Sequence, residues 1–171
     1  MLAPIGVVLL LSFRIEHMSV ASAQAAFWGY AALMGLSLAG VFLVYTGVSV
    51  ARVFFIAAAT FAATSLYGYT TRRDLSQFGS FLFMGLIGIV LASLVNIFLA
   101  SSALQFAISV IGVLVFTGLT AWDTQRIKEI YLESDPGDVL TKKALMGALA
   151  LYLDFINLFV LLLQLTGQRR D

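Results

Sequence analysis

The feature that most constrains this chain is the length of its uncharged apolar runs. No charged residue occurs between Leu75 and Trp122, a stretch too long for one helix across a hydrocarbon core that needs roughly 20 residues. Apolar residues make up 61% of the chain and charged residues 11%, whereas soluble domains are about half apolar and about a quarter charged. A soluble fold of 171 residues could not keep that much apolar surface out of water. The sequence therefore predicts an all-α integral membrane protein.

Charged and turn residues divide the chain into hydrophobic segments within a single domain, residues 1–171. The expected spans are residues 1–13 (partial), 21–46, 53–69, 78–99, 103–125 and 144–166. The charge-free stretch is divided at residues 100–102, and the polar loop after it turns at residues 135–138. Residues 1–13 are too short to cross a bilayer. We expect them to be the second half of a spanning helix whose beginning is missing from this chain.

Basic residues alternate unevenly between the two sides of this topology. One side carries Arg14, Arg72, Arg73, Arg126, Lys128, Lys142 and Lys143, and the other carries Arg52, Arg169 and Arg170. The richer side is predicted to be cytoplasmic by the positive-inside rule. No basic cluster is dense enough to indicate nucleic-acid binding. The absence of cysteine excludes disulfides and thiolate metal sites.

Asp154 is the most informative residue, because it lies in the middle of the last span. It is about ten residues from the nearest lysine, hence about 15 Å deep at the rise of an α-helix. A carboxylate near the bilayer midplane costs about 2.5–3.5 kcal/mol unless something compensates it. Asn157, Gly147 and Gln164 share its helical face, which we expect to look into the bundle. Alternatively, a protonated Asp154 only hydrogen-bonds a neighbouring helix.

Asp123 ends the charge-free stretch, on a helical face that is small or polar at nearly every step. That face runs through Ser109, Gly112, Phe116 and Thr120. Asp123 could instead be an interfacial residue paired locally with Arg126 or Lys128.

The two aspartates lie on consecutive spans that should be antiparallel neighbours. Two carboxyls close together in a low dielectric cannot both ionise cheaply, so they share a proton and titrate as a coupled pair. Asp123 and Asp154 would then form a pH-sensitive latch. The protonated pair ties two helices together, and the ionised pair repels and attracts a cation.

Three segments of the chain carry distinctive patterns. The first is LYLDFINLF at residues 151–159, with Gly167 after it. The second is SVIG at residues 109–112 with TAWDTQRIK at residues 120–128, and the third is YTTRRDL at residues 69–75, followed by GSF at residues 79–81. In that order they resemble the C-terminal signature, the sixth span and the loop after the fourth span of the Bax inhibitor-1 family, also called TMBIM, and above all of its bacterial members. The resemblance covers the whole chain.

This resemblance implies a Bax inhibitor-1-like helical bundle in the bacterial inner membrane, with six helices around the seventh and no cofactor. The chain departs from that seven-helix fold by lacking the first helix and part of the second. The pH-sensing aspartates of the family fall on Asp123 and Asp154, and its second-helix arginine, which latches onto the sixth-helix aspartate, falls on Arg14. Family members are described as pH-dependent calcium leak channels, and as regulators of cell death or of membrane proteases.

The leading hypothesis is therefore a pH-gated cation leak, with Ca²⁺ as the expected ion. Two carboxylates fall short of the six to eight oxygen ligands that Ca²⁺ prefers, so we expect a transient, hydrated site and no structural metal. A second hypothesis is a docking module that regulates a membrane-anchored protease. An intramembrane aspartyl protease is a remote third, because the Gly-x-Gly-Asp and Pro-Ala-Leu motifs of those enzymes are missing. We expect no enzymatic activity.

Overall fold

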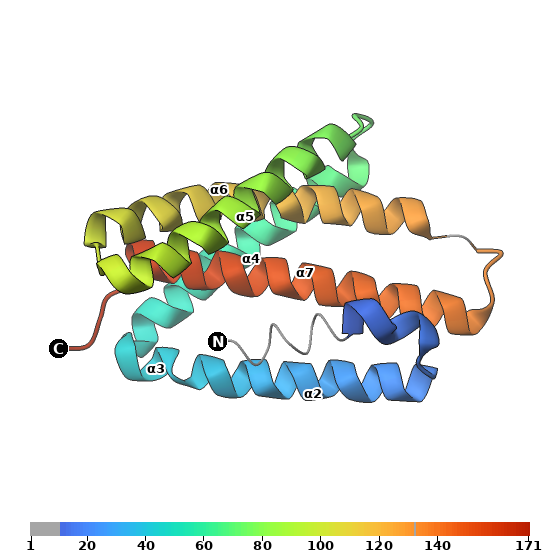
Figure 1. The fold of residues 1–171 in the computed structure, drawn as a ribbon, viewed down its shortest axis with the longest axis horizontal. Coiled ribbons are helices and arrows are strands. Elements are labelled where there is room, and N and C mark those ends of the chain that lie inside the picture. The colour runs from blue at the N-terminus through green and yellow to red at the C-terminus, as the bar shows by residue number, and fades with distance from the viewer. Residues whose placement is uncertain (1–10, 132) are drawn as a thin grey trace.

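The computed structural model of the protein describes residues 11–131 and 133–171. After a helical segment at residues 11–14, the described chain continues through η1 (Ile15–His17), α2 (Val20–Ala39), α3 (Val41–Val44), α4 (Gly47–Thr70), α5 (Ser76–Leu99), α6 (Ser102–Ile130) and α7 (Gly137–Thr166) (Figure 1). Within the described residues, 5 helical segments are long and apolar enough to cross a membrane. The predicted all-α membrane fold is confirmed. Most of the expected partial span, residues 1–13, lies outside the described residues.

Side-chain caps start three of the long helices. Ser19, Thr46 and Ser101 each accept a hydrogen bond from a backbone N–H in the first turn of the helix that follows. Ala100, with a φ of 47°, ends α5 in the left-handed conformation, directly before the Ser101 cap of α6. The charge-free stretch is therefore divided at residues 100–102, where the sequence analysis divides it.

The helix ends differ from the expected spans where charged residues were taken as boundaries. Helix α4 begins at Gly47 rather than residue 53, α6 continues past residue 125 to Ile130, and α7 begins at Gly137 rather than residue 144. Arg52 and Lys142 therefore lie within helices and not in loops. Lysine and arginine are good helix formers, and on an exposed face they do not end a helix.

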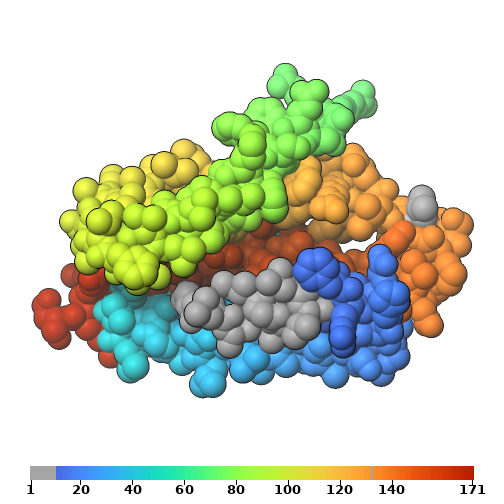
Figure 2. Space-filling view, viewed as in Figure 1, coloured from blue at the N-terminus to red at the C-terminus, as the bar shows by residue number. Residues whose placement is uncertain are grey.

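Helices α6 and α7 pack antiparallel, and α7 lies between α6 and α2 (Figure 1). Figure 2 shows part of α7, in red, between α5 above and α2 below. Gly112 of α6 contacts Leu161 of α7, and Ile127 of α6 contacts Gly147 of α7, which sets the register of the pair. Helix α4 packs against both, α5 packs against α6, and α2 packs against α7. In the most apolar window of α6, 39% of the residues are buried, and the same share holds for α7. The two helices are thus enclosed to the same extent in these windows, because α5 covers α6.

Candidate functional site

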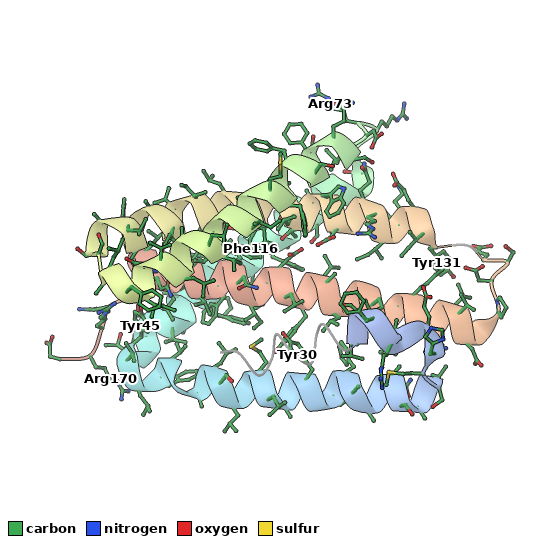
Figure 3. The ribbon with its side chains drawn as sticks, viewed as in Figure 1. Tyr30, Tyr45, Arg73, Phe116, Tyr131 and Arg170 are labelled. Carbon is green, nitrogen blue, oxygen red and sulfur yellow. The ribbon has the colours of Figure 1, made fainter. Side chains whose placement is uncertain are left out.

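The small and polar face of α6 points into the bundle. Ser109 and Thr120 are completely buried, Gly112 and Phe116 are buried, and Asp123 is half-buried one turn further along. Figure 3 shows Phe116 between α6 and α7. Because α6 continues two turns beyond Asp123, this carboxyl lies within the helix rather than at its end.

Asp154 lies on the α7 side of the same interface, with only 4% of its surface exposed. No N–H or hydroxyl of the described residues donates a hydrogen bond to its Oδ2 atom. The carboxyl of Asp123 on α6 lies close enough to that of Asp154 for the two groups to interact directly. The structure therefore brings the two predicted aspartates together between α6 and α7.

Two facing carboxyl groups form a hydrogen bond only when one of them carries a proton. An ionised carboxylate is an acceptor alone, whereas a protonated carboxyl supplies one O–H donor. A buried acceptor without a donor costs about 1–3 kcal/mol, and more if it is charged. This geometry consequently favours one shared proton between Asp123 and Asp154.

The nearby amide and cations are engaged elsewhere. Asn157 donates its side-chain N–H to the backbone oxygen of Leu153 at 2.8 Å. Arg126 is exposed, with its guanidinium 5.4 Å from the ring centroid of Trp122. Lys128 donates to the backbone oxygen of Tyr69 at 2.8 Å. Neither cation lies within ion-pair distance of Asp123, but the charge of Arg126 is close enough to act on that carboxyl.

Arg14 is not brought to the aspartates. Its side chain is exposed, at the residue before η1, where the chain turns into α2. The ion pair found within the described ranges, between Lys143 and Asp135, does not involve it. The latch that the resemblance implies for Arg14 is therefore not formed in this structure, because η1 places the arginine on the outside of the bundle.

A second polar cluster lies further along the α6–α7 interface and escaped the sequence analysis. Gln164 of α7 accepts hydrogen bonds from Gln105 at 2.9 Å and from Ser109 at 3.1 Å. Gln105 in turn accepts a hydrogen bond from Asn96 of α5 at 3.2 Å. Three side-chain amides within apolar spans could have indicated this cluster. Their pairing, however, depends on the register between helices, which the sequence of one helix does not show.

An apolar layer separates this cluster from the aspartate pair. Phe116, Leu158 and Leu161 belong to one buried core, and Leu158 is completely inaccessible. Along α7 the order is Asp154, Leu158, Leu161 and Gln164, each one turn after the last. The interface is therefore polar, then apolar, then polar along its length, and closed in this conformation.

The described residues hold no group of three or more His, Cys, Asp or Glu side chains that could bind a metal ion. A cation at the aspartate pair would have two carboxyl groups and otherwise backbone or water oxygens as ligands. Such a site is better suited to passage of a cation than to its retention.

Comparison with known proteins gives one family over the full length of the chain. The family described as "Inhibitor of apoptosis-promoting Bax1" matches residues 1–171. The inner membrane protein YbhL of Escherichia coli is 52% identical over 171 residues, which cover 99% of this chain and 73% of YbhL. The protein RP147 of Rickettsia prowazekii is 53% identical over 171 residues, covering 100% of this chain and 72% of that protein. Neither relative is named as an enzyme.

Proposed function

Because this chain belongs to the family of the inhibitor of apoptosis-promoting Bax1 and is a multi-pass inner membrane protein, we propose that it is a pH-sensitive cation leak gated by Asp123 and Asp154. The observation that carries the proposal is the buried carboxyl of Asp154, which lies beside that of Asp123 and whose Oδ2 atom has no N–H or hydroxyl donor among the described residues. An amide or a hydroxyl would make a purely structural contact at a lower free-energy cost of burial than a carboxyl. A carboxyl pair in the bundle is a functional feature by default.

In this proposal, the number of protons on the two carboxyls determines whether α6 and α7 stay together or separate. With one proton shared, the carboxyls hold α6 to α7, and Phe116, Leu158 and Leu161 seal the interface. When the proton leaves, two negative charges repel at short range in a medium of low dielectric. The helices then separate at the pair, and the charges that separate them attract a cation.

The route of the ion is the α6–α7 interface itself. The aspartate pair lies on one side of the apolar layer, and the Gln105–Ser109–Gln164 cluster lies on the other. Side-chain oxygens at both positions replace part of the hydration shell of an ion as it passes. Hard oxygen ligands of this kind suit Ca²⁺, which tolerates irregular and partly hydrated coordination.

The test is calcium flux into proteoliposomes, measured with a trapped fluorescent indicator across a range of pH. Asp123→Asn and Asp154→Asn keep the size of the side chain but cannot ionise, so either change should flatten the pH profile. The matched control is Asp138→Asn in the exposed first turn of α7, which should keep the wild-type profile. Wild-type pH profiles in both test variants would end the proposal.

The apolar layer provides a second, independent arm of the same experiment. Leu158→Ala removes buried volume from the seal without touching either carboxyl, so it should raise the calcium leak at every pH. Leu163→Ala is a matched control, because Leu163 is equally buried but packs in the separate core between α4 and α7. An unchanged leak in the Leu158 variant would place the ion route elsewhere.

The alternative function is a docking module that modulates a membrane-anchored protease. A docking protein has no need of a titrating pair, and it should tolerate Asp154→Asn without loss of function. Proteoliposomes that show no calcium flux at any pH would favour this alternative.

A further inference from the structure

A cavity lies away from the aspartate pair, where the corner between α4 and α5 meets α6. Its volume is about 390 Å³. The apolar wall includes Phe78, Leu82, Leu114 and Trp122, and the cavity is open towards the lipid-facing surface, because Phe78 is 63% exposed and Leu114 is 68% exposed. Arg73 and Asp74 line one end. The cavity is therefore amphipathic, with an apolar trough and a charged mouth.

The shape of this cavity is built by contacts between distant parts of the chain. Gln125 of α6 accepts a hydrogen bond from the backbone N–H of Leu75 at 2.9 Å and donates to the backbone oxygen of Arg73 at 2.8 Å. Gly79 packs against the ring of Trp122, and Gly118 packs against Leu82. The corner is thus fixed against α6, and the Arg73 side chain takes no part in fixing it.

Arginines outnumber acidic side chains around the mouth of the cavity, with Arg72, Arg73 and Arg126 near a single lining carboxylate, Asp74. Arg73 stands at the outer end of the α4–α5 corner (Figure 3) and forms no ion pair within the described ranges. Arg72 is exposed beside it, and the Arg126 guanidinium lies over Trp122. Asp74 is the acidic member of the lining, and its carboxylate already accepts a hydrogen bond from the backbone N–H of Ser76 at 2.9 Å.

By the positive-inside rule this mouth lies at the cytoplasmic face, where anionic headgroups attract juxtamembrane arginines by about 1 kcal/mol for each charge. Trp122 has the aromatic character typical of residues at headgroup depth. Another cavity offers a contrast. It is lined at the opposite end of α4 by residues such as Phe54, Phe55 and Phe159, and the described part of its wall has no charged side chain.

We propose that the cavity at the α4–α5 corner binds an anionic phospholipid of the cytoplasmic leaflet. The phosphate group of the lipid pairs with Arg73 at the mouth, supported by Arg72 and Arg126. One acyl chain lies in the trough against Phe78, Leu82 and Leu114. A soluble anion would use the arginines but leave the apolar trough empty, and a neutral lipid would fill the trough but leave Arg73 unpaired.

Trp122 lines the cavity and reports occupancy directly. The chain has 2 tryptophans, and the other, Trp28, is 69% exposed on α2. In a Trp28→Phe protein in phosphatidylcholine vesicles, a small fraction of brominated phosphatidylglycerol should quench Trp122 severalfold more than the same fraction of brominated phosphatidylcholine. In the reciprocal Trp122→Phe protein, the two brominated lipids should quench Trp28 equally.

Changing Arg73 tests the headgroup contact without loosening the corner, because the hydrogen bond to Gln125 uses only the backbone oxygen of Arg73. Arg73→Gln should bring the quenching ratio of the two lipids close to one, and Arg73→Lys should retain most of the preference. Arg170→Gln, at the opposite end of the bundle, is the charge-matched control and should keep the parent ratio.

Equal quenching of Trp122 by the two lipids would overturn the proposal. So would an unchanged ratio in Arg73→Gln, or an equal loss in Arg170→Gln, since that would indicate attraction to the net charge of the protein. Competition by free inorganic phosphate at millimolar concentration would show that an anion, and not a lipid, occupies the mouth, and it would count against the proposal.

Discussion

Gln125 of α6 accepts a hydrogen bond from the backbone N–H of Leu75 at a distance of 2.9 Å, across the corner between α4 and α5. The same amide donates to the backbone oxygen of Arg73 at 2.8 Å. The Gln125 side chain is 7% exposed, so it replaces water for both groups of the corner. One polar side chain of α6 thus holds the loop that carries the arginines of the proposed lipid site.

Replacing Gln125 by leucine should loosen this corner. The apolar side chain has a similar size but leaves a buried N–H and a buried carbonyl without partners, at a cost of about 1–3 kcal/mol each if water does not replace it. Hydrogen–deuterium exchange of the Leu75 amide should accelerate by at least an order of magnitude. Thr60→Val is the control, because Thr60 bonds only to its own helix on an exposed turn. An unchanged exchange rate of the Leu75 amide in the Gln125→Leu variant would mean that packing alone holds the corner.

Gly68 of α4 packs against the backbone of Ala121, so α4 and α6 touch without an intervening side chain. A Cβ atom at this position would overlap the backbone of Ala121, and the helices would have to separate. Gly68→Ala should therefore lower the free energy of unfolding by about 1–3 kcal/mol, the usual cost of overpacking. Thermal melting in detergent measures this as a lower midpoint.

Gly35 of α2 supplies the opposite case, because no atom of the described residues lies within 4 Å of the position of its Cβ atom. Alanine is favoured over glycine within a helix by about 1 kcal/mol, so Gly35→Ala should leave the midpoint unchanged or raise it. Similar changes of the melting midpoint in Gly68→Ala and Gly35→Ala would show that helix packing at Gly68 is looser than the contact with Ala121 indicates.

Much of the fold could be predicted from the sequence, because spans in a membrane must be apolar and helical. The ends of the helices could not be read from charge. Thr46 caps α4 by accepting a hydrogen bond from the Ser49 N–H, and so moves its start ahead of Arg52. The Thr46 cap therefore sets the start of α4, and an exposed arginine in the second turn is compatible with the helix.

The candidate site was predictable where it follows from the pattern of a single helix or from the adjacency of two consecutive helices, as for Asp123 and Asp154. The burial of Asp154 and the inward face of α6 follow from periodicity along one helix, and their functional roles stay predictions. The Gln105–Gln164 hydrogen bond and the Gln125 clamp join residues that are distant in sequence. Such contacts depend on the register between helices, which no pattern within a single span determines.

Asp74 provides a pH-dependent feature outside the membrane spans. Hydrogen bonds from the side chain and backbone of Ser76 hold the pKa of the Asp74 carboxyl below its usual value. A carboxyl with a lowered pKa stabilises the corner above its ordinary pKa of about 3.9, and this contribution is lost as the pH falls through the lowered pKa. Nuclear magnetic resonance titration of the Asp74 side-chain carbon should give a midpoint below 3.9, and Ser76→Ala should raise it. A midpoint that is the same in both proteins would exclude the Ser76 hydroxyl as the cause.

Asp154 should lower the stability of the bundle, because its carboxyl is buried beside that of Asp123 and its Oδ2 atom has no donor among the described residues. Asp154→Asn supplies an N–H donor of the same size that can bond to Asp123 without a shared proton. We expect this variant to be more stable than the wild type at neutral pH by about 1–3 kcal/mol, as a higher melting midpoint in detergent.

The reciprocal change on the same helix tests whether this gain comes from the carboxyl pair. Asn157→Asp removes the donor to the Leu153 oxygen and adds a second carboxyl one turn from Asp154, so it should lower the melting midpoint. Stability gained at a site where function is lost is typical of functional residues, which are selected for activity at a cost in stability. A melting midpoint below that of the wild type in Asp154→Asn would show that the carboxyl pair holds the helices together better than an amide does. The hydrogen bond that the shared proton forms would then stabilise the α6–α7 interface, and separation of the two helices would require this bond to break.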